Sequence, residues 1–438
     1  MMVIKLKNVI NIIMRRMNEE FEKFGRRKKM NSSEYVTLVL AGCQVERLSL
    51  LTKEKAKPTI TFGGVFHLID FTLSNCKHSN VGDIGIITQI FQHDIEEYVG
   101  SGSQWFQENQ NVKITMLSPR VKNGMCELYN GTANAILKNE DYVDQKNPKS
   151  VLVLPGDHVY KMNYAEVLDA HEKSGAAVTI AARRVAPSDA SHFDIIDIGR
   201  GNSINSFEEK PKQPKSNLAS MGIYVFDWAV LKEYLHKCSH DSKFGMDIGS
   251  TIIPRMLSDG EKLDAHIFNG YWKEVGNIQS FWEANMDLLS VRPGIDLDDD
   301  RWKIISREHG ALRHYEHSYL GSGHIVNSLV AENCTNNGTI MRSVVSEDVV
   351  IGDDAAIIDS VILPGARIGR GSFVFKAIIG AQSIIADYTP IGSLKPDGYC
   401  LDSCQGINVV GNNVKIYRHS SGRSSFAVLA RPGEVYAM

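Results

Sequence analysis

Hydrophobic residues in the first two thirds of the chain form short runs, and amphipathic patterns with helical spacing lie between them. The runs are at 37–41, 84–88, 151–154, 178–182 and 222–226, and helical patterns are at 164–174 and 228–236. Strands that alternate with helices predict a mostly parallel sheet covered on both faces. Ligands of such sheets bind beyond the carboxyl ends of the strands. We therefore expect a site in the segments that follow residues 41, 88 and 154.

The pattern changes after about residue 320, where helical periodicity ends and a step of six residues begins. The residues at this step are Val344, Val350, Ala356, Ile362, Ile368 and Val374. Gly352 and Gly369 lie near the expected turns. A fixed six-residue period predicts a β-helix, in which each step supplies one short strand to one face. An ordinary β meander is the alternative, and six consecutive matches favour the β-helix.

These patterns divide the chain into four parts. We expect a basic, poorly ordered N-terminal extension at 1–33 and an α/β domain at 34–290. A connector without a clear period should follow at 291–320, and a β-helix with a C-terminal tail at 321–438. The extension holds nine Lys and Arg against three Glu, a net of +6, within a chain of net charge -3. A targeting sequence or a membrane-surface helix is one interpretation. The other is an early start codon, since Met17 and Met30 could also begin the protein.

Composition narrows the classes of function. The 438 residues are 43% hydrophobic and 23% charged, which is ordinary for a soluble globular protein. The net charge of -3 does not favour nucleic acid as a partner. No run of 18 apolar residues occurs, so we expect no membrane span. The seven cysteines are scattered without a C-x-x-C pair, which argues against a zinc ribbon and favours reduced thiols in the cytoplasm.

The segments after two of the predicted strands carry residues suited to phosphate chemistry. One reads LAGCQVERL from Leu40 to Leu48 and is followed by Lys57. Backbone N–H groups of a glycine-containing loop can approach phosphate closely, and basic side chains can neutralise its charge. Asp157 follows the VLVL strand, at the sheet edge where the strand pattern predicts a site. Taken alone, an aspartate after a strand is more often a turn residue or a helix cap.

An ordered series of motifs gives these residues their specificity. It comprises LAGCQVERL with Lys57-Pro58, then HLIDF at 67–71, LSNC at 73–76, ITQ at 87–89, YNGTA at 129–133, PGDHVYK at 155–161, FEEKP at 207–211, ASMGIYVF at 219–226 and YWKEVG at 271–276. From about residue 35 to 380 the order and spacing resemble the bacterial glucose-1-phosphate adenylyltransferases. The resemblance implies a Rossmann-like nucleotidyltransferase domain followed by a left-handed parallel β-helix.

The resemblance also implies a role for each matching residue. The residues expected to act in catalysis are Arg47, Lys57 and Asp157. Those expected to bind the nucleotide are Gly42, Gln89, Tyr129, Gly131 and Thr132. Those expected to bind the sugar phosphate are Glu209, Lys210, Ser220 and Asp194. The expected Mg²⁺ ligands are Asp157 and Glu274.

The implied reaction joins ATP and glucose 1-phosphate. An oxygen of the sugar phosphate attacks the α-phosphorus of ATP and pyrophosphate leaves, so catalysis rests on positioning and charge neutralisation. The absence of a Ser-His-Asp set from the motifs fits a reaction without a covalent enzyme intermediate. The resemblance further implies a cytoplasmic protein that assembles as a homotetramer or as a mixed tetramer with a paralogue. It also implies regulation by small phosphorylated metabolites, whose negative charge would call for basic residues at their binding sites.

Departures from the family pattern are concentrated in the site. Cys43 and Val45 replace loop glycines, Gln44 stands in place of arginine, and Glu46 adds a negative charge. Outside the loop, the replacements are Asp194 for glycine, Met246 for lysine and Glu274 for aspartate. Several strained or missing contacts could together remove most activity. An active adenylyltransferase, a non-catalytic regulatory subunit, and a pyrophosphorylase for another nucleotide or sugar therefore stay open. The long first domain argues against a hexapeptide acyltransferase.

Overall fold

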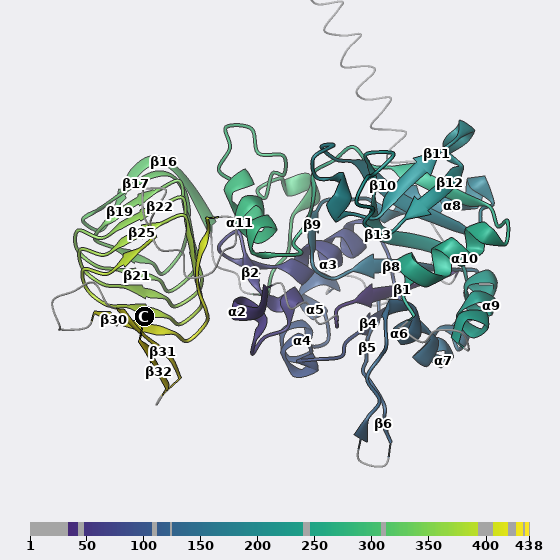
Figure 1. The fold of residues 1–438 in the computed structure, drawn as a ribbon, viewed down its shortest axis with the longest axis horizontal. Coiled ribbons are helices and arrows are strands. Elements are labelled where there is room, and N and C mark those ends of the chain that lie inside the picture. The colour runs from purple at the N-terminus through teal and green to yellow at the C-terminus, as the bar shows by residue number, and fades with distance from the viewer. Residues whose placement is uncertain are drawn as a thin grey trace, which may run out of the picture.

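The computed structural model describes residues 34–42, 48–106, 112–122, 125–239, 246–307, 312–392, 406–418, 426–431 and 434–437. The predicted basic extension lies outside these ranges, and so do Cys43, Gln44, Val45, Glu46 and Arg47. The described chain forms an α/β half and a column of short parallel strands, which lie side by side along the long axis of the molecule (Figure 1).

A mixed sheet forms the centre of the α/β half. Its main path runs β12-β11-β13-β8-β1-β4-β5. Parallel pairings join β1 (Tyr35–Leu40) to β8 (Ser150–Pro155) and to β4 (Ile84–Ile87), which pairs with β5 (Ile114–Leu117). All five predicted apolar runs lie in strands of this sheet.

The other half of the sheet is largely antiparallel. The strand β13 (Leu218–Asp227) runs antiparallel to β8 and to β10 (Val178–Arg184). The remaining strands are β11 (Ile195–Ile198), β12 (Ile204–Glu208) and β14 (Leu263–Ile267), which is parallel to β10. The mixed sheet therefore joins a parallel part, at which the nucleotide motifs lie, to an antiparallel part, at which the sugar-phosphate motifs lie.

Helices cover both faces of the sheet, as the apolar runs predicted. On β1, Val36 and Leu38 belong to one buried cluster, whereas Tyr35 and Val39 belong to another, because successive side chains of a strand point to opposite faces. The first cluster is completed by α6 (Thr132–Lys138), α9 (Trp228–Ser239) and α10 (Ile253–Ser258). The second is completed by α3 (Leu68–His78), α4 (Gln92–Val99) and α8 (Tyr164–Ser174).

The helix α8 shows how the sequence sets these elements. It begins after Asn163, whose side chain accepts a hydrogen bond from the backbone N–H of Ala165 at 3.1 Å. It ends at Gly175, which has a φ of 59°. Its buried residues Tyr164, Val167, Leu168 and His171 follow the spacing of one helical face. The predicted bounds of this helix are confirmed. Among the described residues, no helix has the length and apolar character that crossing a bilayer requires.

The second half is a parallel β-helix, as the six-residue step predicted. Thr339 pairs with Ala356, Ala356 with Phe373, and Phe373 with Pro390, so equivalent positions are 17 residues apart. Its strands include β17 (Gly323–Ala331), β19 (Thr339–Met341), β22 (Ala356–Ile358), β25 (Phe373–Phe375) and β28 (Pro390–Ile391).

The length of the coil corrects the predicted step. Three steps of six residues would need 18 residues for each coil, whereas the pairings give 17. A strict series of six therefore loses phase with the inward-facing positions. Val350 is only half-buried, while its neighbours Val349 and Ile351 are fully buried. Ala356 is likewise half-buried between the buried residues Ala355 and Ile357.

A ladder of serines lines one turn of successive coils. The backbone N–H groups of Ser343, Ser360 and Ala377 donate to the hydroxyls of Ser328, Ser343 and Ser360, each at 3.1 Å. Each hydroxyl also donates to the carbonyl two residues before it. The buried polar groups of this turn are thus satisfied inside the protein. The residue before each serine has positive φ, including Arg342 and Asp359.

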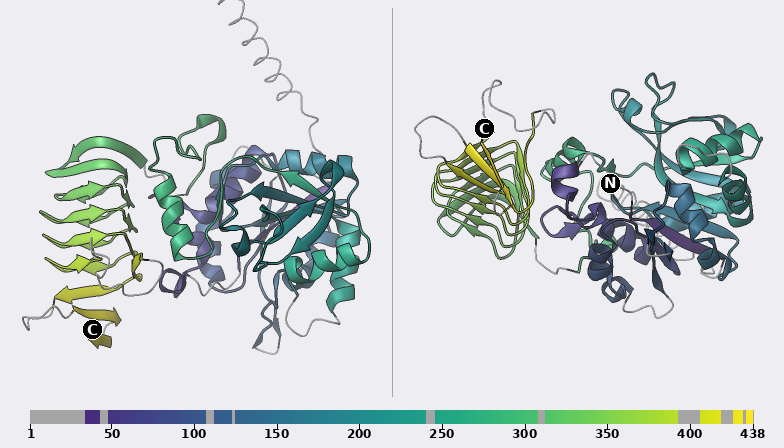
Figure 2. Two further views of the ribbon diagram at one scale, coloured as in Figure 1. Left: turned by 45° about the horizontal axis from the view of Figure 1, so that its top comes forward. Right: turned by 60° about the horizontal axis from the view of Figure 1, so that its bottom comes forward.

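The two halves share one buried apolar cluster. It combines Leu48, Leu51 and Phe281 of the α/β half with residues such as Val344 and Val361 of the β-helix. The helix α11 (Ile278–Asp287) lies between the halves (Figures 1 and 2). Polar contacts add to the junction, because the Trp282 indole donates to the Asp359 carbonyl at 2.8 Å and the Asn412 amide donates to the Leu51 carbonyl at 2.9 Å.

Candidate active site

A cavity of about 210 Å³ opens beyond the carboxyl ends of β1 and β4, where the strand pattern predicted a site. Its lining residues are Leu40, Gly42, Ile87, Gln89, Tyr129, Gly131, Thr132 and Ala135. All five residues expected to bind the nucleotide are among them. They come from three separate segments of the sequence, which the fold brings to one edge of the sheet.

Two glycines of this cavity lie where a side chain would collide with backbone. A Cβ atom on Gly42 would lie 2.5 Å from the backbone nitrogen of Gln89. Gly131 has a φ of 104°, and a Cβ atom there would lie 2.4 Å from the carbonyl oxygen of Met246. The Gln89 side chain accepts a hydrogen bond from the backbone N–H of Tyr129 at 2.5 Å. The walls of this cavity are therefore held by backbone and amide contacts rather than by charge.

Asp247, which was not among the expected site residues, holds Thr132. Its backbone N–H and its hydroxyl both donate to the Asp247 carboxylate, at 2.7 and 3.0 Å. The hydroxyl also accepts from the backbone N–H of Ile248 at 3.0 Å. The hydroxyl of Thr132 is thus engaged within the protein, and Asp247 fixes the first turn of α6 against the cavity.

A second group of residues is organised by charge. The Lys57 ammonium lies 2.5 Å from Oδ2 of Asp157, with the two side chains 5% and 21% exposed. Lys57 begins a 3-10 turn at Lys57–Thr59, and Asp157 lies between β8 and β9 (His158–Tyr160). Burial opposes ionisation of this carboxyl, but the Lys57 ammonium holds the pKa of Asp157 below its usual value. Asp157 is therefore a carboxylate at neutral pH.

His158 lies beside the other oxygen of this carboxylate. The indole Nε1 of Trp272 donates to Nδ1 of His158 at 3.2 Å, so the ring proton lies on Nε2. That nitrogen lies 3.7 Å from Oδ1 of Asp157. Burial lowers the pKa of His158 despite the nearby carboxylates of Asp157 and Glu274, so the ring is neutral. The two oxygens of Asp157 thus face different partners.

Glu274 lies on the strand that pairs with the segment directly after Asp157. It belongs to β15 (Trp272–Glu274), which runs antiparallel to β9 so that His158 pairs with Glu274. No group of three His, Cys, Asp or Glu suited to a metal occurs within the described ranges. Two hard carboxylates fit a divalent metal ion that completes its coordination with phosphate oxygens and water. Asp157 and Glu274 are therefore a suitable donor pair for such an ion.

The residues expected to bind the sugar phosphate also converge. Ile195 pairs with both Glu208 and Ala219, which brings Asp194, Glu209 and Ser220 to the same end of their strands. The backbone N–H of Ser220 donates to the Asp194 carbonyl at 2.8 Å. Lys210, whose φ is 39°, acts on the Asp194 carboxyl through its backbone and its charge.

Asp194 carries an unfavourable charge in this group. Burial raises the pKa of Asp194 to about 6, with Glu209 and Glu274 adding to the rise and Lys210 opposing it. Its Oδ1 is buried without a hydrogen-bond partner among the described residues. A family position that usually holds glycine therefore holds a strained carboxyl beside the expected sugar site.

Comparisons with known proteins decide the family. The Nucleotidyl transferase family model matches residues 36–291, more than half of the chain, and the model of the GlmU-like C-terminal hexapeptide matches 313–398. The chain is 42% identical over 386 residues to glucose-1-phosphate adenylyltransferase of Desulforamulus reducens, covering 88% of this chain and 95% of that protein. For the protein of the same name from Acetivibrio thermocellus the identity is 41% over 395 residues, with coverages of 88% and 91%. The chain belongs to the glucose-1-phosphate adenylyltransferase family.

This assignment confirms the family, the fold class and the enzyme class that the ordered motifs predicted. The structure brings the residues expected to bind the nucleotide into one cavity and the charged residues into a neighbouring group. Arg47 alone among the expected site residues lies outside the described ranges. His158, Trp272 and Asp247 were not among the expected site residues, because their importance rests on contacts between residues that are more than 100 positions apart.

Proposed function

We propose that the chain transfers the adenylyl group of ATP to α-D-glucose 1-phosphate, giving ADP-glucose and pyrophosphate for α-glucan synthesis. The observation that supports this most directly is the continuous arrangement along one edge of the sheet. The nucleotide cavity, the Lys57–Asp157 pair with Glu274, and the group around Lys210 follow one another there. Relatives at 41–42% identity that span most of the chain bear the name of this activity.

The proposed roles follow from these positions. Gly42, Gln89, Tyr129, Gly131 and Thr132 receive adenine and ribose in the cavity that they line. The tight approaches at the two glycines fix the backbone that faces the nucleotide. Because no charged side chain among the described residues lines this cavity, it suits the neutral part of ATP, and the triphosphate would extend toward Lys57.

In the charged group, Asp157 and Glu274 would hold Mg²⁺, which would neutralise negative charge on the triphosphate and the leaving pyrophosphate. Lys57 and Arg47 add positive charge to the phosphates. His158, to which Trp272 donates a hydrogen bond, lies beside one oxygen of Asp157, and Lys57 contacts the other. Lys210 binds the phosphate of the sugar, Glu209 and Asp194 its hydroxyls, and Ser220 contributes from the neighbouring strand.

The acceptor phosphate needs no general base, because it is already an anion at neutral pH. Binding both substrates in line supplies much of the rate, since reaction between held groups avoids the entropy cost of bringing them together. The remaining contribution comes from charges that meet the developing negative charge on the phosphates. We further propose cytoplasmic location, assembly as a homotetramer or a mixed tetramer with a paralogue, and regulation by small phosphorylated metabolites.

Pyrophosphate release by the purified chain, with ATP, glucose 1-phosphate and Mg²⁺, tests the proposal. We expect turnover that Asp157→Ala abolishes, because the metal loses a ligand. Asp169→Ala, at an exposed carboxylate on α8, should keep the wild-type rate. Turnover that Asp157→Ala leaves intact would overturn the metal assignment. A folded chain that shows no turnover would contradict the catalytic function.

The loop sequence favours a second candidate, a non-catalytic regulatory subunit. Cys43 and Val45 stand where the family has glycine, and β-branched Val adapts poorly to positive φ. If the loop limits catalysis, Cys43→Gly combined with Val45→Gly should raise turnover by about tenfold, equivalent to about 1.4 kcal/mol of barrier. An inactive wild-type chain that raises the activity of a paralogue on mixing would support the regulatory subunit instead.

A further inference from the structure

The helix α3 carries two fully buried polar side chains that have no part in the reaction proposed above. Thr72 and Asn75 lie three positions apart, so they occupy one face of the helix. The motifs HLIDF and LSNC cover most of this helix, but none of its residues was among the expected site residues. Burying a polar side chain is costly unless it forms hydrogen bonds, so the partners of Thr72 and Asn75 indicate what they do.

Both side chains bind the backbone of the segment that carries Asp157. The Thr72 hydroxyl donates to the Pro155 carbonyl at 2.7 Å. The Asn75 amide donates to the Tyr160 carbonyl at 3.2 Å, and its oxygen accepts from the backbone N–H two residues later at 3.1 Å. The helix therefore holds the chain both before and after Asp157.

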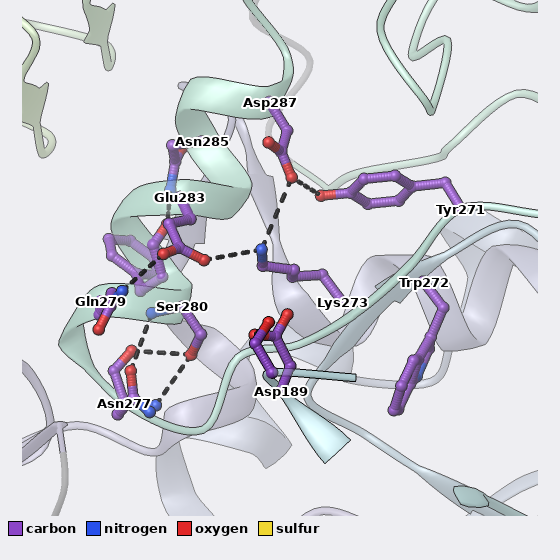
Figure 3. A network of polar contacts seen from close by, with 12 residues as sticks. Asp189, Tyr271, Trp272, Lys273, Asn277, Gln279, Ser280, Glu283, Asn285 and Asp287 are labelled. Atoms are coloured by element: carbon purple, nitrogen blue, oxygen red, sulfur yellow. Dashed lines mark hydrogen bonds and ion pairs between the residues drawn. The ribbon is translucent and has the colours of Figure 1, made fainter. Parts of the chain in front are cut away.

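Strand pairing ends on either side of Asp157. The strand β8 ends at Pro155 and β9 begins at His158, so Asp157 lies in the short connection between them. The strand β9 pairs with β15, whose Lys273 points toward α11 and lies 2.8 Å from Glu283 (Figure 3). The partner strand is thus anchored on α11, whereas the position of Asp157 depends on the two ends that α3 holds.

The same helix also contacts the turn that carries the cationic partner of Asp157. The backbone N–H of Leu68, at the start of α3, donates to the Ile60 carbonyl at 3.3 Å, and the N–H of Ile60 donates to the Lys57 carbonyl at 3.1 Å. The start of α3 is itself fixed, because the Asp70 carboxylate accepts from the backbone N–H of the residue before the helix at 2.7 Å. Both members of the Lys57–Asp157 pair are thus connected to one buried helix.

The connector between the two halves completes the contacts of Asn75. The Trp302 indole donates to the Asn75 oxygen at 2.8 Å, and the Lys161 ammonium contacts the Asp296 carbonyl. The Asn75 oxygen accepts two hydrogen bonds and its nitrogen donates one, so the side chain is held in a single orientation. These contacts are present before any substrate binds.

We propose that Thr72 and Asn75 are positioning residues, which hold the two ends of the segment 155–160 so that the Asp157 carboxylate meets Lys57 in one geometry. Both are fully buried, so they act through Asp157 rather than on a substrate. The proposal rests on the role proposed for Asp157 in the reaction. A displacement of about 1 Å can cost about 10²-fold in rate, so a loosened segment should slow the reaction.

Hydrogen–deuterium exchange of the full chain tests these contacts without relying on activity. Thr72→Val keeps the size of the side chain but removes its hydroxyl, so the bond to the Pro155 carbonyl is lost. Backbone amides of residues 156–162 should then exchange at least about tenfold faster than in the wild type, because the segment opens locally. Thr72→Ser keeps the hydroxyl and should exchange near the wild-type rate.

Thr179→Val is the matched control for Thr72→Val. Thr179 is equally buried, and its hydroxyl lies 3.0 Å from the His171 ring. It belongs to β10, whose partners are β13 and β14. Its substitution should lower overall stability to a similar extent, since each variant loses one buried hydrogen bond, but exchange at 156–162 should not change.

Asn75→Asp tests the other end of the segment. The side chain keeps its size and one acceptor, but an oxygen replaces the amide that donates to the Tyr160 carbonyl. Two acceptors then face each other, so exchange of the same amides should be faster than in the wild type.

Steady-state kinetics separate positioning from a purely structural role. In Thr72→Val, kcat should fall at least about tenfold while KM for ATP stays within about twofold, because the nucleotide cavity is not altered. Thr72→Ser should recover most of kcat, and Thr179→Val should keep it.

Two results would overturn the proposal. One is exchange at 156–162 that Thr72→Val leaves unchanged, or that Thr179→Val speeds equally. The other is faster local exchange in Thr72→Val together with a wild-type kcat. An inactive wild-type chain would contradict the proposed function instead, and the exchange measurements would still decide whether α3 holds the segment.

Discussion

The two ends of the reaction site are built in different ways. The nucleotide end is shaped by backbone, where Gly42 and Gly131 leave no room for a side chain. The phosphate end is a balance of buried charges, in which Lys57 and Asp157 each depend on the other. A site shaped by backbone fails through steric collision, whereas a site balanced by charge fails when one partner is removed. Substitutions at the two ends should therefore have different signatures.

Loss of the buried cation should have the largest effect. Lys57→Ala leaves Asp157 without its closest positive partner, and removing one member of a buried pair costs about 3–5 kcal/mol. We expect kcat/KM to fall by about 10³-fold or more and the free energy of unfolding to fall as well. Steady-state kinetics and urea unfolding would measure both.

Lys173→Ala is the matched control for that change. Lys173 pairs with Asp169 at 2.5 Å on α8, but those side chains are 74% and 56% exposed. Surface pairs contribute little, so activity and stability should stay near wild type. Equal losses in the two variants would show that burial does not distinguish the pairs, and would contradict a charge-balanced phosphate end.

At the nucleotide end, Gly131→Ala should act through backbone. The new Cβ would meet the Met246 carbonyl oxygen at 2.4 Å, at a φ of 104°. We expect a loss of about 2–4 kcal/mol in the free energy of unfolding and a raised KM for ATP. Gly175→Ala has a φ of 59° and nothing within 4 Å, so it should cost only about 1 kcal/mol and leave KM unchanged. Similar kinetics in the two variants would argue against a sterically defined cavity.

Substitution of Asp194 should have the smallest effect of these changes, and the effect on stability should depend on pH. Its folded-state pKa of about 6 lies above the usual 3.8, so the folded chain binds its proton more tightly than the unfolded chain does. The associated stability is present below about pH 4 and is lost as pH rises through 6. Asp194→Asn should therefore be more stable than wild type by about 1–2 kcal/mol at pH 8, and this advantage should shrink between pH 6 and pH 4.

Urea unfolding at pH 8, 6 and 4.5 without divalent ions would measure this difference. Asp169→Asn, at an exposed carboxylate, provides the control and should show no such trend. An advantage of Asp194→Asn that is constant across the range would mean that the carboxyl titrates normally, and that the sugar end does not hold a strained charge.

Most of the fold could be predicted from the sequence because buried positions recur with the period of the strand or helix to which they belong. The strands β1, β4 and β8 are mostly apolar because both of their faces are covered, and α8 has its caps and its apolar spacing in the sequence. The six-residue step identified the β-helix but not its phase. A coil of 17 residues depends on how each corner turns, which a regular step cannot express.

The candidate site could also be predicted from the sequence only in part. Ordered motifs identified the five residues that line the nucleotide cavity, because each motif is contiguous in the sequence. The contacts of Trp272 with His158 and of Asp247 with Thr132 join residues 114 and 115 positions apart, and no local pattern records them.

The apolar cluster shared by the two halves limits how this protein can be divided. Leu48 and Leu51, which directly follow the phosphate loop, are buried with residues of the β-helix such as Val361. A fragment that ended before the β-helix would leave this surface exposed to water and prone to aggregation. Evolution could therefore exchange the β-helix for another partner only by replacing the surface beneath it, so the two halves are inherited as a single unit.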